Sequence, residues 1–377
     1  MYKIMTPGPT QVAENVRLAR SMECTNPDLD GDFVEFYKET CEEISHLLHT
    51  KNQTLILGGE GILGLEAACA SMTEPGDKVL VLDNGIYGRG FADFVSMYGG
   101  KPELYSRDYR ETLNVSELEE YLKKHHDYKY ATVVHGDTPS GMLNDVASIC
   151  PLLKKYGIMT VVDSVSASFG EPLRIDDCQI DIMCGGSQKV VSAPPGLTFV
   201  VISDDAKKAM KERKTPIASF YANLTTFAHY YEEKWFPYTM PISDIYGLRA
   251  AMDNIAADPD ILTRHQQIAE ASRKAVTSAG LNLYLKSGFS NTVTVFEVPE
   301  GTTADAILET VKNDYNIMLA GSFDVLAGKV IRIGHMGNNA EFHKVREVFA
   351  ALDGTMKKLG IPLKSSMEEV FCAEMNR

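Results

Sequence analysis

Two short stretches of the chain, Met159-Thr160-Val161-Val162-Asp163 and Gly185-Gly186-Ser187-Gln188-Lys189, decide the fold. The first is an apolar, β-branched run that ends in a carboxylate, which is typical of a buried strand in a parallel sheet. Runs of the same kind recur from about residue 54, and helical patterns separate several of them. The predicted strands are 54–57, 78–82, 130–135, 159–163, 180–184 and 197–202, and the predicted helices include 64–72, 115–124 and 148–156. This alternation predicts an α/β layer with a mostly parallel sheet.

The pattern changes after about residue 250. Helices are predicted over 261–279 and 304–313, and short strands over 291–297 and 329–333. We therefore expect a large α/β domain over residues 16–250. A smaller α+β domain over 251–377 is expected to include residues 1–15.

Composition excludes several classes of protein. The chain has 377 residues, 44% of them hydrophobic and 23% charged, and a formal net charge of -14. A non-specific nucleic-acid binder needs a basic face, so nucleic acid is not an expected partner. The seven cysteines are scattered without a C-x-x-C pair, which favours neither disulfides nor a metal site and indicates a reducing cytoplasm. No apolar run is long enough to span a membrane, and the start lacks the apolar core of a signal peptide. We expect a cytoplasmic protein that acts on small molecules.

Several loops are predicted to meet at one edge of the sheet. Ligands of open parallel sheets bind beyond the carboxyl ends of the strands. Residues 59–61, Tyr87, Thr138, Asp163 and Lys189 all follow predicted strands, so we expect them to converge there. An amine and a buried carboxylate at neighbouring strand ends can hold a pyridine aldehyde ring, with Lys189 at the aldehyde and Asp163 at the ring nitrogen.

Motifs distributed over nearly the whole chain carry a family resemblance. They are Thr6-Pro7-Gly8-Pro9, Asn84-Gly85-Ile86-Tyr87-Gly88, Asp137-Thr138-Pro139-Ser140-Gly141, Val162-Asp163-Ser164-Val165, Ser187-Gln188-Lys189, Ala193-Pro194-Pro195-Gly196 and Arg332-Ile333-Gly334. With them the chain resembles the class V branch of the fold-type I pyridoxal phosphate enzymes, and within it the alanine-glyoxylate and serine-pyruvate aminotransferases. The resemblance implies a seven-stranded, mostly parallel sheet, pyridoxal 5'-phosphate as cofactor, and a homodimer with shared active sites.

The resemblance also implies roles for single residues at the ring. Lys189 would form the Schiff base and then move a proton between the substrate Cα and the cofactor C4'. Asp163 would keep the ring nitrogen protonated, and Tyr87 would stack on the ring face. Thr138 or Ser140 would donate a hydrogen bond to the phenolic oxygen of the ring.

Further residues are implied for the phosphate and the substrate. Gln188 would reach the phosphate, and Tyr238 and Thr239 would contact the phosphate bound by the partner subunit. Arg332 would bind the substrate carboxylate through two parallel hydrogen bonds, because its guanidinium is planar. The remaining implied positions are Glu60, Gly61, Ile62 and Val165 at the cofactor and Gly8 at the substrate.

One loop departs from the alanine-glyoxylate pattern. Those enzymes have Ser-Gly-Ser-Gly-His at the helix start that cradles the phosphate, whereas this chain has Gly58-Gly59-Glu60-Gly61-Ile62. A carboxylate beside a phosphate is repulsive unless Glu60 is protonated, turned away or paired with a cation such as Arg89. Glu60 could alternatively be an acid at a helix start that touches no ligand. The same turn is similar to that of the pyridoxamine-pyruvate aminotransferases, in which the unphosphorylated vitamin is a substrate. A second arginine of that subgroup is Phe323 here.

Four readings follow. The first is an aminotransferase that moves an amino group between an alanine-type or serine-type amino acid and pyruvate or glyoxylate. The second is a pyridoxamine-pyruvate aminotransferase, and the third is a 2-aminoethylphosphonate-pyruvate transaminase, which the motif around Asp137 fits less well. The fourth is a non-enzymatic ligand-binding protein on the same fold, which the presence of Lys189 and Asp163 disfavours. A cysteine desulfurase is disfavoured because Cys372 is the only cysteine after residue 184.

Overall fold

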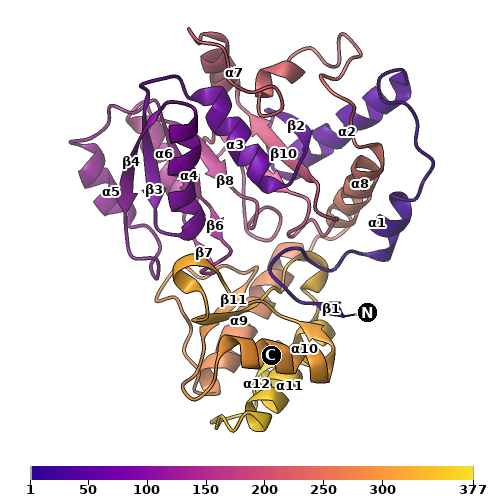
Figure 1. Ribbon diagram of the computed structural model, residues 1–377, viewed down its shortest axis with the longest axis vertical. Helices are drawn as coiled ribbons and strands as arrows, with labels where there is room; N and C mark the ends of the chain where they lie inside the picture. The colour runs from indigo at the N-terminus through magenta and orange to yellow at the C-terminus, as the bar shows by residue number, and fades with distance from the viewer. Residues whose placement is uncertain (1, 377) are drawn as a thin grey trace.

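The computed structural model describes residues 2–376, and its centre is a seven-stranded sheet with the order β2-β10-β9-β8-β5-β3-β4 (Figure 1). Five of the strands follow the predicted apolar runs, and β10 alone runs in the direction opposite to that of the other six. The strands are β2 (Gln53–Gly58), β3 (Lys78–Asp83), β4 (Lys101–Ser106), β5 (Tyr130–Val134), β8 (Met159–Asp163), β9 (Ile182–Gly186) and β10 (Leu197–Ile202). The predicted α/β fold with a mostly parallel seven-stranded sheet is confirmed.

Two strands differ from the sequence prediction. β4 was not among the predicted runs, because it is an edge strand in which only Tyr105 is buried and no apolar run forms. β9 begins two residues later than predicted and extends through Gly185 and Gly186. Glycine is a weak strand former, but the ring of Phe199 on β10 lies where a Cβ at Gly185 would be, so the absence of a side chain is required for packing.

The helices of the large layer pack on this sheet. α3 (Gly61–Met72) contacts β9 and β10, α4 (Ile86–Met97) contacts β3 and β4, and α6 (Val146–Lys155) contacts β8. α3 is buried along most of its length, which explains its composition of small and apolar residues. The other helices of this layer are α1 (Glu14–Ala19), α2 (Gly31–Leu47), α5 (Val115–Leu122), α7 (Asp204–Lys211), η1 (Leu224–Phe227) and α8 (Ile242–Ala256), and a small hairpin joins β6 (Gly136–Asp137) to β7 (Met142–Leu143).

A second hydrophobic core lies below the sheet layer in Figure 1, in the orange and yellow part of the chain. It is built on the antiparallel pair β11 (Thr294–Glu297) and β13 (Val330–Ile333). Its helices are α9 (Ile261–Ser278), α10 (Ala304–Tyr315), α11 (Phe342–Lys358) and α12 (Met367–Met375), with the short turns η2 (Asp324–Leu326) and η3 (Gly337–Asn339). The predicted boundary at residue 250 falls inside α8 and stays a prediction.

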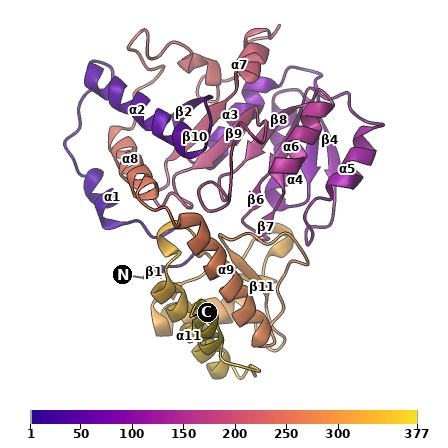
Figure 2. The same cartoon turned by 180° about the vertical axis from the view of Figure 1, so that it is seen from behind.

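The N-terminal segment connects the two layers (Figure 2). β1 (Lys3–Ile4) pairs in parallel with β12 (Ile317–Met318), and Met5 lies in the second core. The chain then reaches the large layer, where the N–H of Thr10 donates to the carbonyl oxygen of Gln188. The segment therefore runs past the residues that follow β9. In residues 2–376 no helix is both long and apolar enough to cross a membrane.

Candidate active site

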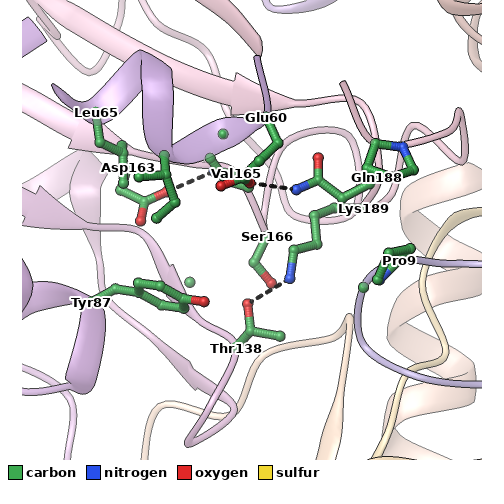
Figure 3. Close-up of a pocket in the computed structure, with 15 residues that line it drawn as sticks. Pro9, Glu60, Leu65, Tyr87, Thr138, Asp163, Val165, Ser166, Gln188 and Lys189 are labelled. Atoms are coloured by element: carbon green, nitrogen blue, oxygen red, sulfur yellow. Dashed lines mark hydrogen bonds between the residues drawn. The ribbon is translucent and has the colours of Figure 1, made fainter. Parts of the chain in front are cut away.

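A cavity of about 300 Å³ lies at the carboxyl ends of β2, β3, β5, β8 and β9 (Figure 3). The polarity of these strands brings their following loops to one edge, as the sequence predicted. The lining residues are Gly8, Pro9, Glu60, Gly61, Ile62, Leu65, Tyr87, Gly136, Thr138, Asp163, Val165, Ser166, Gln188, Lys189 and Pro195. Ten of the sequence-predicted site residues are in this set.

Lys189 follows β9 and its amine lies inside the cavity (Figure 3). Lys189 Nζ donates to the carbonyl oxygen of Pro7 at 2.8 Å and to Thr138 Oγ1 at 3.4 Å. A Cβ at Gly8, whose φ is +112°, would lie 2.5 Å from Nζ, so glycine leaves room for the lysine. Burial, and then the positive charge of Arg332, lowers the pKa of Lys189 to about 8. An amine with this pKa is readily available in its neutral, nucleophilic form near neutral pH.

Asp163 ends β8 and is buried, with 4% of its surface exposed. Its Oδ1 accepts a hydrogen bond from the N–H of Val165 at 2.9 Å. Burial raises the pKa of Asp163 to about 7, although the Val165 N–H acts in the opposite direction. A cationic ring nitrogen next to this carboxyl would stabilise the ionised form, which suits Asp163 to the protonated nitrogen of a pyridine ring.

Asp137 organises the loop on which Thr138 lies. Its Oδ1 accepts a hydrogen bond from the N–H of Tyr87 at 3.2 Å, and its Oδ2 accepts one from Ser140 Oγ at 2.5 Å. The hydroxyl of Ser140 is therefore occupied by Asp137, whereas Thr138 Oγ1 faces Lys189 across the cavity (Figure 3). Thr138 and Ser140 are the two hydroxyl residues predicted to bind the phenolic oxygen of the ring. Of these, only the Thr138 hydroxyl faces Lys189 and remains available for such a bond.

Glu60 lies at the N-cap position of α3, but its side chain caps no N–H of the helix. Its Oε2 accepts a hydrogen bond from Gln188 Nε2 at 2.8 Å instead, and both side chains line the cavity (Figure 3). The suggested pairing with Arg89 is wrong: Arg89 is paired with Asp83 at 3.1 Å, because Asp83 ends β3 directly before the helix that carries Arg89. The alternative of an acid that touches no ligand is also disfavoured by the position of Glu60 in the cavity wall.

The start of α3 adds donors to the same wall. The first N–H groups of a helix have no partner within it, and here they belong to Gly61 and Ile62, which both line the cavity. A Cβ at Gly61 would lie 2.7 Å from the side chain of Val165, so the backbone approaches this neighbour closely. This helix start favours an anion, whereas the carboxylate of Glu60 disfavours one. Gln188 Oε1 is buried and has no hydrogen-bond partner within residues 2–376, which leaves an acceptor for a bound group.

Arg332 lies on β13 and is not among the residues that line the cavity, but it contacts Thr138, which is. Its Nε donates to the carbonyl oxygen of Gly321 at 2.5 Å and its Nη1 donates to that of Thr138 at 3.2 Å. Burial lowers the pKa of Arg332, and Tyr87 and Asp137 act in the opposite direction. In the described part of the chain, Arg332 forms no ion pair with a carboxylate. The guanidinium is thus held in place by carbonyl groups and keeps its charge available for an anionic ligand.

Tyr238 and Thr239 do not line the cavity of their own chain. The Tyr238 ring stacks on Tyr221 with 4.4 Å between the ring centroids, and Thr239 is exposed and donates to Asp28 Oδ2 at 3.4 Å. Their contact with a partner's phosphate stays a prediction that requires a second copy of the chain.

Ser166 is a cavity residue that was not predicted from the sequence. Its side chain points toward Thr138 and Lys189 in Figure 3, and its hydroxyl makes no hydrogen bond within the described residues. Its position three residues after the end of β8 was the only local signal, since such loops supply ligand contacts. Residues 2–376 hold no cluster of three or more histidine, cysteine or acidic side chains that could bind a metal ion.

Comparison with known proteins gives concordant results. The family model described as "Aminotransferase class-V" matches residues 13–336. Pyridoxamine-pyruvate transaminase from Mesorhizobium japonicum is 33% identical over 340 residues, which cover 88% of this chain and 86% of that protein. Alanine-glyoxylate aminotransferase from Felis catus is 29% identical over 94% of this chain and 87% of its own length. The crystal structure of ureidoglycine-glyoxylate aminotransferase from Bacillus subtilis is 25% identical, has a TM-score of 0.96, and covers 100% of this chain and 98% of its own.

Proposed function

Because this chain belongs to the class V aminotransferases and is a transaminase, we propose that it moves an amino group between a small alanine-type or serine-type amino acid and pyruvate or glyoxylate, with pyridoxal 5'-phosphate as cofactor. The observation that supports this most directly is the placement of Lys189 and Asp163 in one cavity. The amine and the buried carboxyl are the two groups that a pyridine aldehyde needs at its opposite ends.

Each residue has a task that its surroundings support. The bound cofactor supplies the aldehyde and a ring that accepts electrons. Lys189, with its lowered pKa, would accept the proton that leaves the substrate Cα and deliver it to the C4' atom of the cofactor. Asp163 would hold the proton on the ring nitrogen, Thr138 would orient the ring through its hydroxyl, and Tyr87 would cover one face of the ring, since all three line the cavity.

Arg332 provides the binding site for the α-carboxylate. Its guanidinium is fixed by the carbonyl groups of Gly321 and Thr138, and Nη2 makes no hydrogen bond within the described residues. A carboxylate that binds there is held near the hydroxyl of Thr138, which is itself within hydrogen-bond distance of Lys189. Binding at Arg332 therefore orients the substrate so that its Cα faces the lysine amine.

The test is spectroscopic and kinetic. Purified protein with added pyridoxal phosphate is expected to develop a yellow absorbance band that borohydride removes, and Lys189→Ala is expected to abolish both the band and amino transfer. Lys155→Ala serves as the matched control, because Lys155 is an exposed lysine whose amine is paired with Glu119 on the surface. A Lys189→Ala variant that retains amino transfer would refute this assignment.

Glu60 supports a second candidate, the transfer of an amino group from pyridoxamine to pyruvate. Lys189 is the only cationic side chain that lines the described cavity, and Glu60 and Asp163 contribute two carboxyl groups. Two like charges about 4 Å apart repel each other by on the order of 4 kcal/mol at an effective dielectric constant of 20. An uncharged hydroxymethyl group in place of the phosphate avoids this repulsion and can donate a hydrogen bond to Glu60 or to the unpaired Gln188 Oε1.

Two measurements separate the two candidates: the affinity for pyridoxal phosphate and the rate of amino transfer from pyridoxamine to pyruvate. If the phosphate is bound at α3, Glu60→Ser is expected to tighten pyridoxal phosphate by about tenfold or more, because the repulsion is removed and a hydroxyl donor is added. If the unphosphorylated vitamin is the substrate, the wild-type protein is expected to turn over pyridoxamine with pyruvate, and Glu60→Ser is expected to reduce that rate. If Glu60→Ser changes neither the affinity for pyridoxal phosphate nor the rate with pyridoxamine, Glu60 lies outside both binding sites.

A homodimer with shared active sites is part of the proposal. Phe220, Tyr221 and Trp235 are each more than half exposed in the single chain, in the same region as Tyr238 and Thr239. A second copy that covers these aromatic residues would bring residues 238–239 to its neighbour's cavity. Sedimentation at micromolar concentration is expected to show a dimer.

A further inference from the structure

Phe323 is an exposed aromatic residue beside the candidate site. The residue is 43% exposed, and its ring centroid lies 6.1 Å from that of Tyr87 in an edge-to-face arrangement. Tyr87 lines the cavity, so Phe323 stands next to the ring that is expected to cover the cofactor. An exposed apolar side chain beside a cavity residue is available to contact a bound molecule.

The segment that carries Phe323 is fixed to the carboxylate site. Gly321 accepts the hydrogen bond from Arg332 Nε, and Ser322 Oγ donates to the carbonyl oxygen of Pro139 at 3.3 Å. Ala320 forms a β-bridge with Arg332. Phe323 is therefore held at a defined position relative to Arg332, and a ligand bound to the guanidinium has this ring as a neighbour.

The surroundings offer no second cation to a bound substrate. Within the described residues, Lys189 is the only cationic side chain in the cavity wall, and Arg332 is required for the α-carboxylate. The guanidinium groups of Arg89 and Arg110, which line a second cavity together with Asp324 and Val325, already have partners: Arg89 is paired with Asp83 at 3.1 Å and Arg110 with Glu297 at 2.9 Å. A second carboxylate placed against Phe323 would lose hydration without gaining a partner.

We propose that Tyr87 and Phe323 form an apolar corner that receives the side chain of the amino acid, so that the enzyme selects linear apolar monocarboxylic donors and rejects dicarboxylic ones. This inference rests on the proposed function for Arg332 and makes the substrate class more specific. The corner acts in two ways. Apolar substrate side chains gain contact with the Phe323 ring, whereas a carboxylate on the side chain loses bound water there and finds no cation to replace it.

The experiment uses two matched pairs of ligands. Norvaline and glutamate are five-carbon donors that differ in the second carboxylate, and pentanoate and glutarate are the corresponding non-reacting acids. The ratio of kcat/KM for norvaline to that for glutamate is measured for wild type, Phe323→Arg, Phe323→Leu and Val325→Ala. Calorimetry measures the binding of pentanoate and glutarate to the same holoenzymes. Val325→Ala is the control, because Val325 is 50% exposed on the same turn and has no aromatic contact with Tyr87.

Wild type is expected to prefer norvaline and pentanoate. Phe323→Arg is expected to shift both ratios toward the dicarboxylic ligand by about tenfold or more, the factor that corresponds to 1.4 kcal/mol. Phe323→Leu is expected to retain the preference, and Val325→Ala is expected to leave it unchanged.

Ratios that are the same in wild type and Phe323→Arg, or a wild-type preference for glutarate, would overturn the inference. Failure of the proposed function gives a different result. In that case no donor is turned over by any variant, while the calorimetric ratio still reports whether Phe323 discriminates between the two acids.

Discussion

Asp163→Asn is predicted to stabilise the cofactor-free protein at alkaline pH while it removes activity. Burial raises the pKa of Asp163 from 3.8 to about 7 in the folded chain. The folded state thus binds this proton more tightly than the unfolded state does, and ionisation of the carboxyl opposes folding. The cost is absent below about pH 4, grows as the pH rises, and reaches its full value above about pH 7.

The magnitude follows from the two pKa values. A tenfold difference in proton affinity corresponds to about 1.36 kcal/mol, so the full cost at pH 8 is about 4 kcal/mol and the cost at pH 5 is about 1.6 kcal/mol. Asparagine carries no charge, and its side-chain oxygen can still accept the hydrogen bond from the Val165 N–H. The gain in stability from Asp163→Asn is therefore expected to be about 2.5 kcal/mol larger at pH 8 than at pH 5.

Urea unfolding of the cofactor-free proteins at both pH values is the assay. Asp145→Asn is the control. Asp145 is exposed and caps α6 by accepting a hydrogen bond from the N–H of Ser148, and asparagine is an equally good N-cap residue. A gain that is equal at pH 5 and pH 8, or a loss of stability at pH 8, would refute the electrostatic explanation. Amino transfer is expected to fall by at least tenfold in the same variant, because the ring nitrogen loses its anionic partner.

Three further predictions concern packing and binding. Gly8→Ala places a methyl group 2.5 Å from the amine of Lys189 at a φ of +112°, so activity should fall by about tenfold or more in a rate assay, and a fully active variant would contradict the packing. Arg332→Lys removes the two-bond contact proposed for the α-carboxylate, so KM for pyruvate should rise at least about tenfold with a smaller change in kcat; an unchanged KM would exclude Arg332 from the site. Gly185→Ala meets the ring of Phe199 at 2.1 Å and should lower the free energy of unfolding by about 1–3 kcal/mol in urea titrations, whereas the control Gly90→Ala, with open space around it, should leave stability unchanged or higher.

The sequence predicts the fold best where a local pattern carries the information. The apolar runs that became β3, β5, β8 and β10 are buried on both faces, so they appear as continuous hydrophobic stretches. β4 has no such stretch, because Tyr105 is its one buried residue; β2 is also an edge strand, but its central residues are buried and form an apolar run. The same limit applies to Ser166, whose importance comes from its orientation into the cavity and not from its residue type.

The sequence by itself determined the chemistry: a lysine and a buried carboxylate at the ends of neighbouring strands, and an arginine on a later strand. Strand polarity forces the lysine and the carboxylate to one edge of the parallel sheet, so their convergence needs no coordinates. Arg332 lies on β13 of a separate antiparallel pair, and only the tertiary structure brings it to Thr138. Only the tertiary structure decided their partners. Glu60 accepts a hydrogen bond from Gln188, Ser140 is occupied by Asp137, and Phe323 lies against Tyr87. The Glu60 and Phe323 contacts join residues far apart in the chain, and packing in three dimensions, which leaves no trace in local periodicity, selects them from many alternatives.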